Sequence, residues 1–169
     1  MKAGSSRRAS RNRKARVPLS SLRTAEVVRT IVDHPRRLDE LVSMIEESDL
    51  RVRDRAAATL ARLAESHPGR LVRVIDRLSE GLADDSAYVR WNLAFAFGAL
   101  GARFPGRLPG FLARLSDRLD DENRIVRVMA CESLMRIASR HPRAVFEHFE
   151  STKRQAPRPL QRILPRSKE

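Results

Sequence analysis

A short pattern recurs at a fixed spacing of 37 residues and limits the folds that this chain can adopt. The dipeptides Val52-Arg53, Val89-Arg90 and Val126-Arg127 mark three copies. Apolar residues follow seven and ten residues after each arginine, and a proline follows after fifteen. Self-similarity at a period of this length is typical of an array of stacked units that share one continuous core.

Each copy predicts two helices. The apolar positions have helical spacing rather than the alternation of a strand. A proline disfavours helix in the residue before it and suits the first turn of a new helix. Asp49, Ser86 and Asn123 stand four residues before the arginines, where a short polar side chain can cap the long helix for about 1 kcal/mol. We expect helices near 19–33, 36–47, 50–66, 70–82, 87–103, 106–119, 124–140 and 143–153, and a short one near 158–164.

Charge divides the chain into three parts. Residues 1–18 hold seven Lys/Arg and no acid, and residues 151–169 hold six against a single acid, Glu169. Residues 19–150 hold 21 Arg and 20 Asp/Glu, so the central part is nearly neutral. We expect a disordered basic tail over 1–18, a helical solenoid over 19–153 and a basic tail over 154–169. A uniformly basic nucleic-acid-binding fold is excluded.

Several classes of protein are excluded by composition and motif. One cysteine, Cys131, allows no intramolecular disulfide and no cysteine-based zinc site, and it shares its column with two alanines, which predicts a buried thiol. The longest apolar run has about twelve residues, whereas a membrane span needs about twenty. No secretory signal is evident. We find no phosphate loop, nucleophile elbow or metal-ligand spacing, so we expect a cytoplasmic protein without cofactor, metal or integral membrane segment.

Two helices per unit, with an acid six residues before the arginine, resemble HEAT repeats of the short bacterial and archaeal type, also called PBS-lyase-like repeats. The resemblance covers about residues 35–150. It implies an all-α fold, an α-solenoid of about three full HEAT-like helical hairpins with flanking capping helices. It also implies that acids and arginines form a stabilising ladder along the stack, and the residues concerned are Glu47, Arg53, Asp84, Arg90, Asp121 and Arg127.

In HEAT stacks the second helix of each unit lines the concave face, and the resemblance carries this role to eight residues. They are Arg55, Arg62, Trp91, Asn92, Phe95, Val128, Met129 and Arg136. Trp91 and Phe95 are four residues apart and share one side of their helix. An aromatic centre with a charged rim is typical of a protein-binding hot spot. Burial of Trp91 in the core, or under a tail, is the alternative interpretation.

Three functional hypotheses follow. The first is a non-enzymatic scaffold that binds a protein partner through its concave face. The second is a nucleic-acid-associated protein, in which the amino-terminal tail neutralises phosphates through Arg7, Arg8, Arg11, Arg13, Lys14 and Arg16. Tails that only solubilise the chain, or that bind acidic proteins or lipids, are the alternatives. The third is an enzyme, because some HEAT-like stacks are DNA glycosylases with a concave carboxylate, here Asp54. The oligomeric state stays open.

Overall fold

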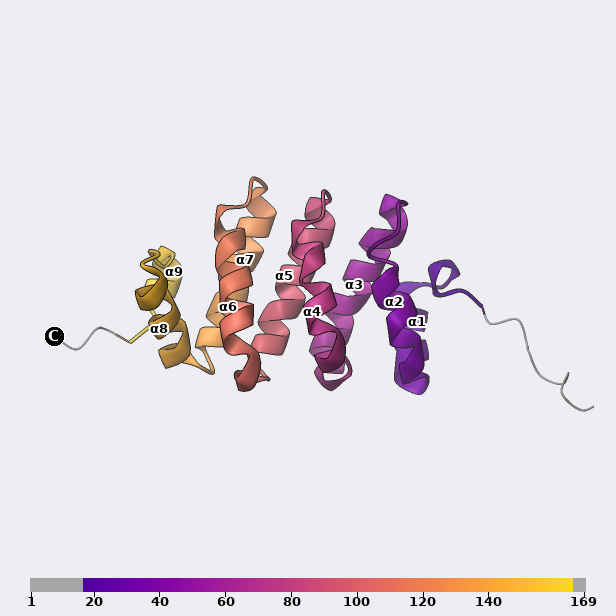
Figure 1. Ribbon diagram of the computed structural model, residues 1–169, viewed down its shortest axis with the longest axis horizontal. Helices are drawn as coiled ribbons and strands as arrows, with labels where there is room; N and C mark the ends of the chain where they lie inside the picture. Colours follow the sequence, from indigo (N-terminus) through magenta and orange to yellow (C-terminus); the bar gives the residue numbers. More distant parts are fainter. Residues whose placement is uncertain (1–16, 166–169) are drawn as a thin grey trace, which may run out of the picture.

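A computed structural model describes residues 17–165, and every regular element within them is helical. The helices follow one another along the long axis of the molecule, from α1 at one end to α8 and α9 at the other (Figure 1). Their bounds are α1 (Thr24–Asp33), α2 (Leu38–Ser43), α3 (Leu50–Ser66), α4 (Ile75–Leu78), α5 (Ala87–Gly101), α6 (Leu108–Asp117), α7 (Arg124–Ala138), α8 (Pro142–Thr152) and α9 (Arg158–Gln161).

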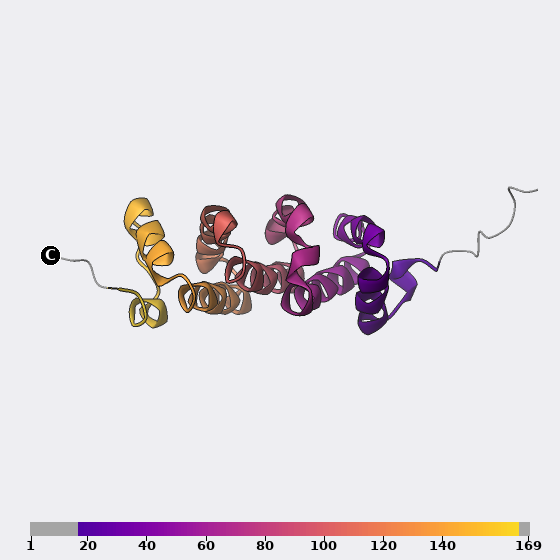
Figure 2. The same cartoon turned by 90° about the horizontal axis from the view of Figure 1, so that it is seen from below.

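The helices form two rows. Figure 2 shows α4, α6 and α8 in one row and α3, α5 and α7 in the other, with α9 beyond α7 in the second row. In the second row α3 packs directly on α5, and α5 packs directly on α7. This arrangement confirms the predicted all-α solenoid of stacked hairpins. Within the described part of the chain, no helix is long and apolar enough to cross a membrane.

The predicted start signals hold the long helices in place. The Asp49 carboxylate accepts a hydrogen bond from the N–H of Arg51, and the Asn123 amide oxygen accepts one from the N–H of Ile125. The Ser86 hydroxyl accepts one from the N–H of Val89. Each cap satisfies an N–H that has no partner inside the helix. Prolines begin the first turn of the following helical segment, as expected, at Pro68, Pro105 and Pro142.

The first helices of the units are more broken than the sequence predicts. The apolar spacing predicts one helix over 70–82, but only Ile75–Leu78 is α-helical, and 3-10 turns at Val72–Val74 and Glu80–Ala83 flank it. Helix propensity is reduced here by β-branched residues at 72, 74 and 75 and by Gly81. The helix expected over 36–47 likewise shrinks to α2, which a 3-10 turn at Pro35–Arg37 precedes.

Both ends of the described part of the chain pack on the solenoid. The short helix expected near 158–164, within the predicted basic tail, is present as α9, whose Leu160 is fully buried and which packs on α7. Arg154 forms ion pairs with Asp117 and Asp120. At the other end Leu19 is buried, and Arg37 donates to the carbonyl of Val17. The basic residues of the predicted amino-terminal tail, Arg7, Arg8, Arg11, Arg13, Lys14 and Arg16, lie outside the described residues.

The core follows the repeat columns. Val89, Leu93, Phe97 and Leu100 of α5 are fully buried, as the spacing predicts. Close approach of α5 to α7 depends on Gly98. A Cβ atom placed at Gly98 would lie 2.5 Å from the Ser133 Cβ and 2.8 Å from its Cα. The Ser133 hydroxyl donates to the carbonyl of Ala94 across the same contact, at 2.9 Å.

We predict that Gly98→Ala lowers the free energy of unfolding. Helix propensity alone would favour alanine by about 1 kcal/mol, but overpacking against the Ser133 backbone costs about 1–3 kcal/mol. Gly106→Ala is the matched control, because nothing lies within 4 Å of a Cβ at Gly106. Denaturant unfolding of both variants checks the prediction. A Gly98→Ala protein as stable as the Gly106→Ala protein would contradict it.

Candidate functional site

The long helices are linked by arginine–aspartate pairs that cross from one unit to the next. Arg53 Nε donates to Asp84 Oδ2 at 2.9 Å, and Arg90 Nε donates to Asp121 Oδ2 at the same distance. Each arginine also donates through Nη1 to two carbonyls of the turn before its own helix. The carboxylate partner therefore comes from the following unit, whereas the acid six residues before the arginine belongs to its own turn.

The pair of Arg90 and Asp121 is the most buried of these links. Its two side chains are 7% and 3% exposed. Burial alone would raise the pKa of Asp121, but hydrogen bonds from Arg90 and from the Asn123 N–H, with the charges of Arg90 and Arg118, outweigh it and lower that pKa. The hydrogen bond to Asp121 raises the pKa of Arg90. Both groups stay ionised at neutral pH, and the link is a charged one.

Five apolar side chains gather on the exposed side of α5 and α7. We call them the apolar patch, and they are Tyr88, Trp91, Phe95, Ile125 and Val128. Spacings of three and four residues place the α5 members on one side of that helix, and the 37-residue offset places Ile125 and Val128 at matching positions of α7. Tyr88 and Ile125 are 44% and 60% exposed, and Val128 is 46% exposed. Trp91 and Phe95 are half-buried.

The aromatic part of the patch is ordered by ring contacts and bordered by charge. The rings of Tyr88 and Trp91 meet edge to face, with centroids 5.2 Å apart. The Arg136 guanidinium lies 5.5 Å from the centroid of the Phe95 ring, within the range of a cation–π contact. Arg136 Nη2 also lies 3.3 Å from Glu65 Oε1 on α3. Side chains from α3 and α7 thus meet across α5.

The structure places the predicted concave residues unequally. Trp91, Phe95, Val128 and Arg136 border or form the patch, and Arg62 is exposed on α3. Asn92 does not reach this surface. It is 4% exposed and donates to the carbonyl of Tyr88, because the close packing of α5 with its neighbours covers this side of the helix.

Two further predicted residues serve the fold. Met129 packs partly buried against the core, and Arg55 donates to the carbonyls of Ser20 and Leu22, which ties the amino-terminal segment to α3. Asp54, the carboxylate of the glycosylase hypothesis, accepts a hydrogen bond from the Ser86 hydroxyl at 2.9 Å. Among the described residues, no group of His, Cys, Asp and Glu side chains could hold a metal ion.

Sequence reasoning missed Tyr88 and Ile125. Both stand two residues before a ladder arginine, so the repeat register puts them in one column, and their large apolar side chains were a usable signal.

The expected burial of Cys131 is also not observed. Cys131 is half-buried and lines a pocket, because the short α9 covers less of α7 than a full unit would. Its partial burial, and to a smaller extent the negative charge of Glu132, raise the pKa of its thiol.

Two of the solved structures that are similar in fold are designed armadillo repeat proteins. An engineered protein matches with a TM-score of 0.58 and 20% identity over 76% of this chain, and the chain spans 57% of its length. A designed armadillo repeat protein matches with a TM-score of 0.60 and 19% identity, over 85% of this chain and 67% of the other. A second one, in complex with the peptide (KR)4, matches with a TM-score of 0.55 and 17% identity over the same shares. A search of curated proteins gave no match.

The stacked hairpins and these neighbours define the chain as an α-solenoid of the HEAT and armadillo kind. Residues 70–158, which are more than half of the sequence, match a family model described as non-SMC mitotic condensation complex subunit 1. The chain belongs to that family.

Proposed function

We propose that the protein is a non-enzymatic scaffold that binds an extended segment of a partner protein along the face of α3, α5 and α7. The observation that carries this proposal is the apolar patch. A half-buried tryptophan beside an exposed tyrosine and two exposed aliphatic residues leaves apolar surface in water, and contiguous patches of this kind mark interaction sites. Tyrosine and tryptophan are also the residues that most often dominate binding energy.

The family and one similar structure also support a role in protein binding. The family is described as a subunit of a condensation complex, which suggests that this chain too works within a protein assembly. A designed armadillo repeat protein of similar fold was solved with a bound peptide. The mixed rim of Arg62, Glu65 and Arg136 suits a segment that carries both polar and apolar side chains. The cytoplasmic location expected from the sequence stays part of this proposal.

Trp91→Ala should weaken peptide binding by about 30-fold, the effect of losing one hot-spot residue worth about 2 kcal/mol. Peptides selected on the wild-type protein from a random library would be measured against three proteins by fluorescence anisotropy: wild type, Trp91→Ala and Leu50→Ala. Leu50 is the matched control, because it is an apolar residue that is 49% exposed at the start of α3, outside the patch. Equal affinities of all three proteins would contradict the proposal.

A second candidate function, binding to nucleic acid, is favoured by one observation. Beside the patch, a pocket of about 540 Å³ is lined by Arg103, Arg136 and Arg140 and, among residues 17–165, by no acid. Ala99, Ala102 and Ser139 complete its wall. Arginine forks bind phosphate oxygens well, and the basic residues at 1–16 would add sequence-independent affinity.

The nucleic-acid hypothesis predicts salt-sensitive binding that depends on the amino-terminal residues. Duplex DNA would be titrated at two salt concentrations into the full chain, a chain that begins at Val17, and an Arg103→Gln/Arg140→Gln variant. We expect the shortened chain to bind with much lower affinity. The slope of log affinity against log salt should fall by about 0.9 for each phosphate that the protein no longer neutralises. No binding by the full chain at low salt would exclude this function.

A further inference from the structure

Within the described residues, the arginine–aspartate ladder ends with an arginine that has no carboxylate partner. Arg127 holds the same position in its unit as Arg53 and Arg90, and its Nη1 group donates to the carbonyls of Asp121 and Glu122 at 2.7 and 2.8 Å. The inner arginines make the same two contacts with their own turns. The guanidinium of Arg127 is therefore anchored in the pose of a ladder residue.

Arg127 differs from Arg90 in the N–H groups that face the next unit. Arg90 gives its Nε and Nη2 groups to the two oxygens of Asp121, at 2.9 and 2.8 Å. Within residues 17–165, the Nε and Nη2 groups of Arg127 have no hydrogen-bond partner. The position 37 residues after Asp121, where the next acid would stand, is occupied by Arg158. The fold thus presents a preoriented guanidinium fork without the carboxylate that the repeat would supply.

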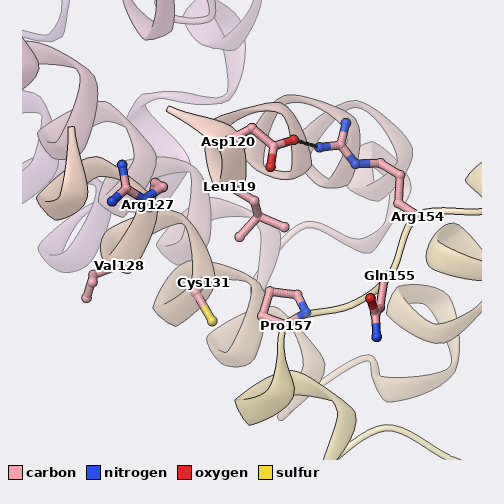
Figure 3. A pocket seen from close by; sticks show the side chains of 8 residues that line it. All are labelled: Leu119, Asp120, Arg127, Val128, Cys131, Arg154, Gln155 and Pro157. Carbon is pink, nitrogen blue, oxygen red and sulfur yellow. Dashed lines mark hydrogen bonds and ion pairs between the residues drawn. The ribbon is translucent and has the colours of Figure 1, made fainter. Parts of the chain in front are cut away.

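This fork lies at a pocket. A pocket of about 620 Å³ opens between α7, the turn at Arg118–Asp120 and the segment after α8, and Figure 3 shows its lining side chains. Its apolar wall is formed by Leu119, Val128, Cys131 and Pro157. Asp120, another lining residue, is paired with Arg154, so in the part of the chain that the structure describes Arg127 is the charged lining residue without an ion pair.

We propose that this pocket binds a protein segment in which an aspartate or glutamate lies close to an aliphatic side chain. The carboxylate would accept two parallel hydrogen bonds from Arg127, as Asp121 does from Arg90, and the aliphatic group would pack on Leu119, Val128 and Pro157. A planar carboxylate fits the Nε and Nη2 N–H groups of this guanidinium. The apolar wall favours a peptide with an aliphatic side chain over a small free anion. The inference goes beyond the proposed function, because Val128 is the one residue of the apolar patch that it uses.

The probe for this site is the loop that fills the equivalent place beside Arg90. A synthetic peptide with the sequence of residues 118–124 carries Leu119 and Asp121 in their native spacing. Its binding would be followed by NMR on the full-length ¹⁵N-labelled protein, through the Nε–Hε cross-peak of Arg127. We expect a saturable shift of this peak, and about tenfold weaker binding of the same peptide with Asp121→Asn, because the charge-assisted pair is removed.

Protein variants separate the site from general electrostatics. Arg127→Gln should reduce affinity for the peptide about tenfold, whereas Arg140→Gln, which removes an equal charge near the end of the same helix, should not change it. Trp91→Ala should also leave this binding unchanged, so failure of the patch and failure of the pocket give different results. If circular dichroism shows that the Arg127→Gln protein is unfolded, the binding of the two peptides to the wild-type protein still tests the proposal.

Four results would overturn the proposal. One is equal binding of the native peptide and the peptide with Asp121→Asn. Another is an equal decrease of affinity in the Arg127→Gln and Arg140→Gln proteins. A third is displacement of the peptide by inorganic phosphate of similar affinity, which would make the pocket a simple anion site. The fourth is self-association of the full chain that Arg127→Gln abolishes, which would make a second copy the occupant.

Discussion

A buried guanidinium is costly to desolvate, and its pairing with an equally buried carboxylate is what makes Arg90 tolerable inside this stack. The pairing has a second consequence, because the two charges belong to different units. Arg90 reaches forward to Asp121 and, through Nη1, back to the carbonyls of Asp84 and Asp85. One side chain therefore fixes its own turn and the following one, and Arg53 does the same one unit earlier. The relative placement of α3, α5 and α7 depends on these links, and so does the exposed face that those helices present.

The same links explain where the ladder of arginines and aspartates stops. A ladder that pairs each arginine with the next unit must leave an arginine at its carboxyl-terminal end, and here that residue is Arg127. The chain continues into α9, whose buried Leu160 covers part of α7. Because α9 is only one turn long, Cys131 is only half-buried and Val128 is 46% exposed. Their equivalents in α5, Ala94 and Trp91, lie beside the full-length helix α7. The pocket beside Arg127 and the edge of the apolar patch thus result from one feature, the short helix α9 beside α7.

Much of this fold can be predicted from the sequence, and the limits have physical causes. The long helices are predicted well because apolar spacing, a polar cap and a following proline agree at Asp49, Ser86 and Asn123. The prediction for the range 70–82 fails because β-branched residues and Gly81 oppose a continuous helix that the apolar spacing favours. The prediction that Asn92 lies on the exposed face is wrong. The neighbouring helices cover this side of α5, and the spacing within one helix does not show how far they extend over it. The spacing alone does not show which acid pairs with a given arginine. The acid six residues before an arginine and the acid 31 residues after it stand in the same column of the repeat.

The central claim is that charged links between units, rather than apolar packing alone, determine how the repeats are joined. A double-mutant cycle on Arg90→Gln and Asp121→Asn, measured by denaturant unfolding, tests it most directly. We expect a coupling free energy of about 2 kcal/mol, within the range for residues that share a buried network. The same cycle on Arg73 and Asp39, whose side chains are 53% and 54% exposed, should give less than about 1 kcal/mol. Equal coupling in the two cycles, or no coupling between Arg90 and Asp121, would contradict the account.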